Sequence, residues 1–307
     1  MSLNSCVYAI FVVSLRQIWK NMNEFWKRTL FGAIYVAVVV GSIVAWKPYV
    51  FSAISCVLAT MAVREFHQLM GKRSIFDFVC DRSAMILVFA SVLIANNSKY
   101  GWIPLLIYFL AIIGVLVAEL WRKSENPIAN WGTEIIGQMM IALPFCAMNM
   151  LAYMDAWLLL ALFVLIWVND SGAYCVGSLT AKRKNGNHKM FPRISPKKSW
   201  EGLFGGFVFA IGAALVMNRF GWFDAITAHC EGALAYVVAI AFALVGCIFG
   251  TLGDLMESMV KRSVGVKDSG VFMPGHGGVL DRFDSMLFAA PMVALFCWLC
   301  LNCSSLF

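Results

Sequence analysis

The sequence predicts an all-α, polytopic membrane protein, and three observations support this fold class. Of its 307 residues, 61% are hydrophobic, well above the apolar fraction of an ordinary soluble domain. The apolar residues gather in separate segments, most of them close to the roughly 20 residues that a bilayer-spanning helix needs. Lysine and arginine concentrate in alternate connecting segments, so we attribute the net charge of +7 to cytoplasmic loops and expect no nucleic-acid partner.

Nine segments are predicted to cross the membrane. In chain order they are 30–46, 49–63, 84–96, 101–121, 134–154, 156–170, 202–218, 232–253 and 285–305. The second, third and sixth are short, so their ends are the least well defined. A short segment can still span a bilayer when its ends are anchored or the bilayer thins.

The basic residues predict the orientation of these helices. With a cytoplasmic N-terminus, 21 of the 24 lysines and arginines fall on the cytoplasmic side, including seven within 182–198 and four within 261–282. Only Lys47, Lys99 and Arg219 fall outside. Omission of one short helix would invert half of the loops and remove this bias. The sequence therefore predicts an integral protein of the cell membrane whose two longest polar stretches face the cytoplasm.

The chain is interpreted as one membrane domain with three regions. Residues 1–29 form a cytoplasmic or interfacial extension, 30–155 the N-terminal helices, and 156–307 the catalytic region. The apolar run Val7–Leu15 precedes its positive charges, which is the reverse of a secretory signal peptide. No internal repeat or linker divides the chain further.

The first polar stretch, Asn169–Gly202, begins with an acid at membrane depth. Asp170 is expected to close the sixth helix, and such a carboxylate is by default a functional hypothesis, with a structural pair to a lysine as the alternative. Beyond it, cations and hydroxyl groups suited to phosphate oxygens follow in Ser195, Lys197, Lys198 and Ser199. The simpler interpretation of these lysines is a positive anchor for the next helix.

The second polar stretch, Ser258–Asp284, contains seven charged residues, one histidine and five glycines. If the preceding helix continues, Asp254, Ser258 and Lys261 share one face. Asp281 and Asp284, three residues apart, would share a face likewise. Three carboxylates gathered in a nearly dry site either bind protons or hold a cation, and Mg²⁺ prefers oxygen ligands of this kind.

Several other patterns carry less weight. Two S-x-x-K tetrapeptides lack the companion motifs of penicillin-recognising enzymes, and the GHGG run at 275–278 is no Walker loop. His276 alone is weak support for acid–base catalysis. Glu119 and Glu134 lie near helix ends, and we favour a solvated or helix-capping role for both.

The spacing of these residues resembles the phosphatidate cytidylyltransferase family, also called CDP-diacylglycerol synthases. Thirteen positions fall in register with its signature: Ser258, Lys261, Arg262, Lys267, Asp268, Gly270, Pro274, His276, Gly277, Gly278, Asp281, Arg282 and Asp284. DSGAY at 170–174 and PRISPKKSWEG at 192–202 are similar to the family as well. Met273 stands where Leu, Ile or Phe is usual, and Ser199 replaces the commoner Thr. The resemblance covers residues 156–307.

The resemblance implies a reaction in which CTP and phosphatidic acid give CDP-diacylglycerol and pyrophosphate, with Mg²⁺ as the cofactor. Whether a second cation takes part is left open. By this account Asp254, Asp281 and Asp284 hold metal. Phosphates would be bound by Lys197, Lys198, Lys261, Arg262 and Arg282 and positioned by Ser195, Ser199, Ser258, His276, Gly277 and Gly278, with Lys267 and Asp268 also at the substrate site. Asp170 either completes the metal site or orients a lysine. The oligomeric state is left open between a monomer and a homodimer.

Two rival functions remain at this point. A transporter of an anionic metabolite would also carry charge at membrane depth, but it should show repeats and broken helices in corresponding halves. A CDP-alcohol transferase would show the motif D-G-x-x-A-R followed by two aspartates. The sequence contains neither feature.

Overall fold

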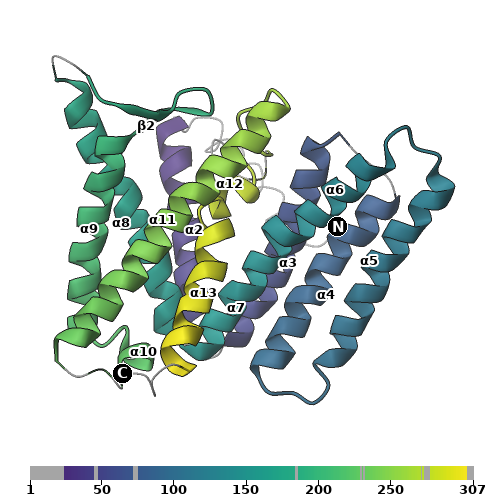
Figure 1. Cartoon of the computed structure of the whole chain (residues 1–307), viewed down its shortest axis with the longest axis horizontal. Coiled ribbons are helices and arrows are strands. Elements are labelled where there is room, and N and C mark those ends of the chain that lie inside the picture. The colour runs from purple at the N-terminus through teal and green to yellow at the C-terminus, as the bar shows by residue number, and fades with distance from the viewer. Residues whose placement is uncertain are drawn as a thin grey trace, which may run out of the picture.

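A computed structural model describes residues 24–44, 48–71, 75–183, 186–228, 230, 232–270, 272 and 277–302 of the chain. Within these residues the protein is a bundle of long helices, which confirms the predicted fold class (Figure 1). Eight helices in the described part are long and apolar enough to cross a membrane, and Thr29–Val44 is a shorter apolar helix. Each of the nine predicted segments coincides with one of these helices. The extension before Glu24 lies outside the described residues.

The elements follow one another along the chain with short connections. They are α2 (Glu24–Val44), α3 (Pro48–Leu69), α4 (Ile75–Ala95), α5 (Trp102–Arg122), α6 (Pro127–Gly137), the π-helix η1 (Gln138–Ala142), α7 (Leu143–Met154), α8 (Ala156–Ala181), β1 (Lys189–Phe191), β2 (Ser195–Ser199), α9 (Trp200–Arg219), α10 (Asp224–Thr227), α11 (Ala233–Ser263), α12 (Leu280–Phe283) and α13 (Met286–Asn302). The segment from α6 to α7 forms one continuous span, 127–154.

Four helices run further than the apolar segments predicted. Helix α3 ends at Leu69 and α4 begins at Ile75, while α8 and α11 continue to Ala181 and Ser263. The prediction that Asp170 closes its helix is therefore wrong, because it lies well inside α8. The apolar segments did not predict these helix ends because the ends contain polar side chains. Those side chains have buried partners, as in the His67–Asp81 pair at 2.6 Å.

Glu119 and Glu134 are not solvated, contrary to expectation. Both are buried, and their carboxylates are paired within the protein. Glu119 accepts a hydrogen bond from Asn130, and Glu134 lies 3.1 Å from Nε2 of His67. These contacts supply the partners that buried carboxylates require.

A small antiparallel hairpin stands where the sequence predicted only a loop. β1 and β2 pair with Lys189 opposite Ser199 and Phe191 opposite Ser195. The hairpin leads directly into α9, whose first turn is capped by Ser199 because its Oγ accepts the N–H of Gly202 at 3.2 Å. Lys197 and Lys198 therefore lie on a strand that is paired with β1 and leads directly into a helix.

Close helix contacts position the polar segments. A Cβ at Gly205 or Gly206 of α9 would collide with Val176 or Asn169 of α8, so only glycine lets these helices approach. Phe283 at the end of α12 is buried, with its ring centroid 5.1 Å from that of Phe145. The hydrophobic core thus anchors the segment that carries Asp281 and Asp284.

The two long polar stretches lie at the same end of the bundle. Figure 1 shows β2, α12 and the start of α6 at one end of the long helices, with α10 at the other. This arrangement agrees with the alternation of loops that the basic residues predicted.

Candidate active site

An ion pair joins the first polar stretch to α11, the helix that leads into the second. Nζ of Lys198, on β2, lies 2.7 Å from Oδ2 of Asp254 on α11. The other oxygen of Asp254 accepts a hydrogen bond from Oγ of Ser258 at 3.2 Å, which confirms that these two residues share a helix face. The hairpin and α11 therefore meet at a charged contact.

Two cavities share Asp170 as a lining residue, and Lys198 lines the first of them. The first, of about 200 Å³, is lined by Asp170 together with Lys197 and Lys198. The second, of about 270 Å³, is lined by Asp170 with Asp281, Arg282 and Asp284. Asp170 thus stands between a cation-lined cavity and a carboxylate-lined one, although these residues come from segments far apart in the sequence.

Asp284 is held beside α11 by a close approach of the two backbones. A Cβ at Gly253 would lie 2.6 Å from the carbonyl oxygen of Asp284, so glycine is required there. Oδ1 of Asp284 accepts the N–H of Ser285 at 2.6 Å, and the carboxylate lies within electrostatic range of Asp254 and Asp170. The three carboxylates thus influence one another electrostatically.

A divalent cation at these acids would need substrate oxygens to complete its coordination. Among the described residues no three acidic, histidine or cysteine side chains come close enough to form a ready-made metal site. Mg²⁺ does not need one, because it is usually held by one or two carboxylates plus substrate phosphates and water. Asp254, Asp284 and Asp170 supply the surplus negative charge for such a site.

Asp281 has a different environment from Asp284. Its Oδ1 lies 2.6 Å from Nζ of Lys261, and its Oδ2 accepts the backbone N–H groups of Ser269 at 2.8 Å and Gly278 at 2.7 Å. Both carboxylate oxygens are thus engaged by donors of the protein. Asp281 orders the loop before α12, and its predicted role as a metal ligand remains untested.

Lys261 is buried between two carboxylates. Besides Asp281, its Nζ contacts Oε2 of Glu257 at 2.5 Å, one helical turn earlier on α11. The Glu–Lys spacing of four residues was a visible signal for this pair, which the sequence analysis overlooked. A lysine placed in this way fixes the loop in position, and its predicted contact with phosphate remains a prediction.

Glu65, which was not predicted as a site residue, binds the same loop from the N-terminal half of the chain. Its two carboxylate oxygens accept the N–H groups of Val279 and Leu280, each at 2.9 Å, and Oγ of Ser269 donates to it at 3.1 Å. Glu65 is buried on α3, so the contacts are shielded from water. No motif surrounds Glu65, and its partners are mainly backbone amides.

The glycines of the loop leave room for the carboxylate of Glu65. A Cβ at Gly270 would lie 2.9 Å from Oε1 of Glu65, and a Cβ at Gly278 would collide with both Oε2 of Glu65 and Oγ of Ser269. Gly277 has φ +83°, a conformation that side chains rarely adopt. The steric need for glycine here arises from two buried carboxylates, Glu65 and Asp281.

The remaining predicted residues are less central. Arg262, Lys267 and Asp268 are exposed beyond the buried part of α11, and Nη1 of Arg262 donates to the carbonyl of Val266 at 2.7 Å. None of the three lines either cavity.

Ser195 begins β2, and Ser199 caps α9 while also lining the cation-lined cavity. His276 lies outside the described residues. Tyr35 of α2 was not predicted, but it donates to the carbonyl of Arg282 at 3.1 Å.

Comparisons with known proteins identify relatives of the chain. The model of a cytidylyltransferase family matches residues 26–300. A Staphylococcus epidermidis protein named phosphatidate cytidylyltransferase is 34% identical over 242 residues, which cover 68% of this chain and 87% of that protein. A Bacillus subtilis protein of the same name is 43% identical over 130 residues, covering 42% of this chain and 43% of that protein.

Proposed function

Because the chain belongs to the cytidylyltransferase family, we infer that it transfers the cytidylyl group of CTP to phosphatidate, giving CDP-diacylglycerol and pyrophosphate. The observation that carries this function is the position of Asp170 between two cavities, one lined by lysines and the other by acids. A polyphosphate needs the first environment, and a bridging cation needs the second.

The residues of the site suggest a division of roles. Lys197 and Lys198 bind phosphate oxygens of CTP, and Lys198 exchanges its contact with Asp254 for one with substrate. Arg282, in the carboxylate-lined cavity, binds the phosphate of the lipid. Asp254, Asp284 and Asp170 would hold Mg²⁺, which when bound neutralises charge on the attacking and leaving phosphate oxygens.

The loop before α12 acts as a rigid support in this proposal. Glu65 and Asp281 accept three backbone N–H groups of residues 278–280 between them, and Lys261 ties Asp281 to α11. Asp284 follows one turn later, so its position depends on this support. Preorganisation of this kind is favourable because no reorganisation is needed during the reaction.

The reaction itself has a direct test. Membranes containing the protein, incubated with CTP labelled in its γ-phosphate, are expected to release labelled pyrophosphate only when phosphatidate is added. Membranes without the protein provide the control. Release of CMP from an added CDP-lipid and a free alcohol, with no pyrophosphate released from CTP, would indicate an alcohol transferase, and uptake of the label without release of pyrophosphate would indicate a transporter.

We further propose that the site faces the cytoplasm, and cysteine labelling tests this. The charge bias places 182–198 and 261–282 on the cytoplasmic side, where CTP is made. Single cysteines introduced at Lys182 and Lys267 should react with an impermeant maleimide only after the cells are opened. A cysteine at Lys99, on the opposite side, should react in intact cells. The reverse pattern would refute the orientation.

A further inference from the structure

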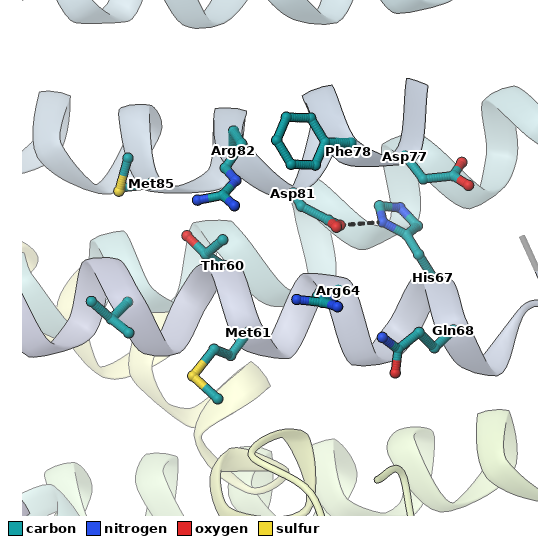
Figure 2. Close-up of a pocket in the computed structure, with 11 residues that line it drawn as sticks. Thr60, Met61, Arg64, His67, Gln68, Asp77, Phe78, Asp81, Arg82 and Met85 are labelled. Atoms are coloured by element: carbon teal, nitrogen blue, oxygen red, sulfur yellow. Dashed lines mark hydrogen bonds and ion pairs between the residues drawn. The ribbon is translucent and has the colours of Figure 1, made fainter. Parts of the chain in front are cut away.

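A separate cavity of about 520 Å³ opens between α3 and α4, away from the candidate active site (Figure 2). One face of α3 forms its lower wall in that view, with side chains spaced as neighbours on one side of a helix. The lining residues used below are Val57, Thr60, Arg64, Phe78, Arg82 and Met85. None of them belongs to the candidate active site.

Two arginines from facing helices dominate this cavity. Figure 2 shows Arg82 extending from α4 toward Thr60 of α3, with Arg64 nearby on α3. Both arginines are exposed. Within the described part of the chain neither one forms an ion pair with a carboxylate, although Arg82 lies 4.8 Å from the centre of the Phe78 ring. Both guanidinium groups therefore retain donors for a ligand.

Asp77 and Asp81 also line the cavity, and a histidine pairs with Asp81 and with Glu134 behind it. Nδ1 of His67 lies 2.6 Å from Asp81, and its Nε2 lies 3.1 Å from Glu134. All three side chains are buried. The arginines could in principle serve only to balance this buried charge from outside, and the experiment below separates that role from ligand binding.

The two arginines lie near the ends of their helices, within reach of lipid phosphates. Arg64 lies five residues before the end of α3 and Arg82 seven after the start of α4, or about 8 and 10 Å along the helices. The headgroup layer is roughly 5–7 Å thick on each side of the bilayer, so these long side chains reach it. An arginine near a helix end extends its charged group into this layer, where an anionic phosphate complements it.

The rest of the cavity suits an acyl chain. Val57 and Met85 lie closer to the middle of the membrane than the arginines, with 56% and 39% of their surfaces exposed. We propose that this cavity binds one anionic phospholipid, with the phosphate between Arg64 and Arg82 and an acyl chain against Val57 and Met85. Basic pockets between membrane helices on the cytoplasmic side bind lipids of this kind. The proposal does not depend on the proposed function.

The test measures lipid binding without CTP. The purified protein and its Arg64→Gln/Arg82→Gln variant are titrated with phosphatidate, phosphatidylglycerol or phosphatidylcholine, and bound lipids are counted by native mass spectrometry. Loss of two arginines should weaken binding of the anionic lipids about thirtyfold and leave phosphatidylcholine unchanged. Arg219→Gln, an exposed arginine at the end of α9, serves as the matched control and should bind like the parent.

The outcomes distinguish the sources of the phosphate. Weakening for phosphatidate alone assigns the cavity to a phosphomonoester lipid, and weakening for both assigns it to anionic lipids in general. Binding of inorganic phosphate that the double substitution abolishes, with unchanged lipid binding, would overturn the lipid proposal. So would unchanged titrations for all three lipids. If the double variant does not fold, Arg82→Lys keeps the charge but loses the planar fork, and weaker binding of the anionic lipids is again expected.

Discussion

Asp284→Asn is expected to lower turnover about a thousandfold while most of the protein remains folded. Asn keeps the shape of the side chain and can still accept the 2.6 Å hydrogen bond from Ser285. It removes the negative charge that would hold a divalent ion beside Asp254 and Asp170. Stabilisation of the transition state by such an ion is worth several kcal/mol, and each 1.4 kcal/mol corresponds to a tenfold change in rate.

Asp281→Asn provides an informative comparison. This change leaves Lys261 buried without one of its two charged partners and weakens contacts to two backbone amides. Breaking such a pair costs roughly 3–5 kcal/mol, so this variant should lose stability as well as activity. The measurement is activity per folded molecule across a Mg²⁺ titration, with thermal unfolding recorded in parallel. Wild-type specific activity with the same Mg²⁺ midpoint in Asp284→Asn would reject its assignment as a metal ligand.

Glu65→Ala should abolish most activity although Glu65 belongs to none of the motifs. The substitution leaves the backbone N–H groups of Val279 and Leu280 without their buried acceptor, while the hydroxyl of Ser269 keeps Asp281 as an acceptor at 3.0 Å. Each buried donor without an acceptor lowers the free energy of unfolding by about 1–3 kcal/mol, and the loop is therefore expected to shift. Because Asp284 follows that loop, a displacement of about 1 Å would reduce kcat on the order of a hundredfold. KM for CTP should change less, since Lys197 and Lys198 lie on the hairpin.

Two further variants make the Glu65 experiment specific. Glu65→Gln keeps one acceptor oxygen and should recover part of kcat. Glu119→Gln is the matched control, because Glu119 is also a buried acid in a membrane helix but binds Asn130 away from both cavities. It should lower the melting temperature with little change in activity per folded molecule. Equal losses of kcat in Glu65→Ala and Glu119→Gln would mean that both act only through stability.

The helical fold was predictable because its signals are strong and redundant. Apolar segments and the positions of 21 basic residues independently indicated the same nine helices. The ends of α3, α4, α8 and α11 were not predictable, because side chains such as His67 look exposed in a sequence and are buried by partners on other helices. The hairpin was missed since its strands are three and five residues long and include a proline.

The parts of the site that consist of side chains in a sequence motif were predictable. The parts that depend on contacts to backbone atoms were not. Lys198, Asp254 and Ser258 were expected at one site, and they are in contact. The grip of Glu65 on Val279 and Leu280 involves main-chain amides, which leave no pattern of residue types. The separate roles of Asp281 and Asp284 depend on which way each carboxylate points, and spacing alone could not distinguish them.

The grip of Glu65 also has a consequence for how the protein is made. Glu65 and Val279 are separated by 214 positions, so the loop before α12 can reach its final conformation only against a helix inserted much earlier. Synthesis from the N-terminus meets this order, because α3 enters the membrane before the loop leaves the ribosome. A fragment that begins after α7 would carry every recognisable motif of the chain. It would still lack Glu65, which accepts the backbone hydrogen bonds that hold the loop before α12.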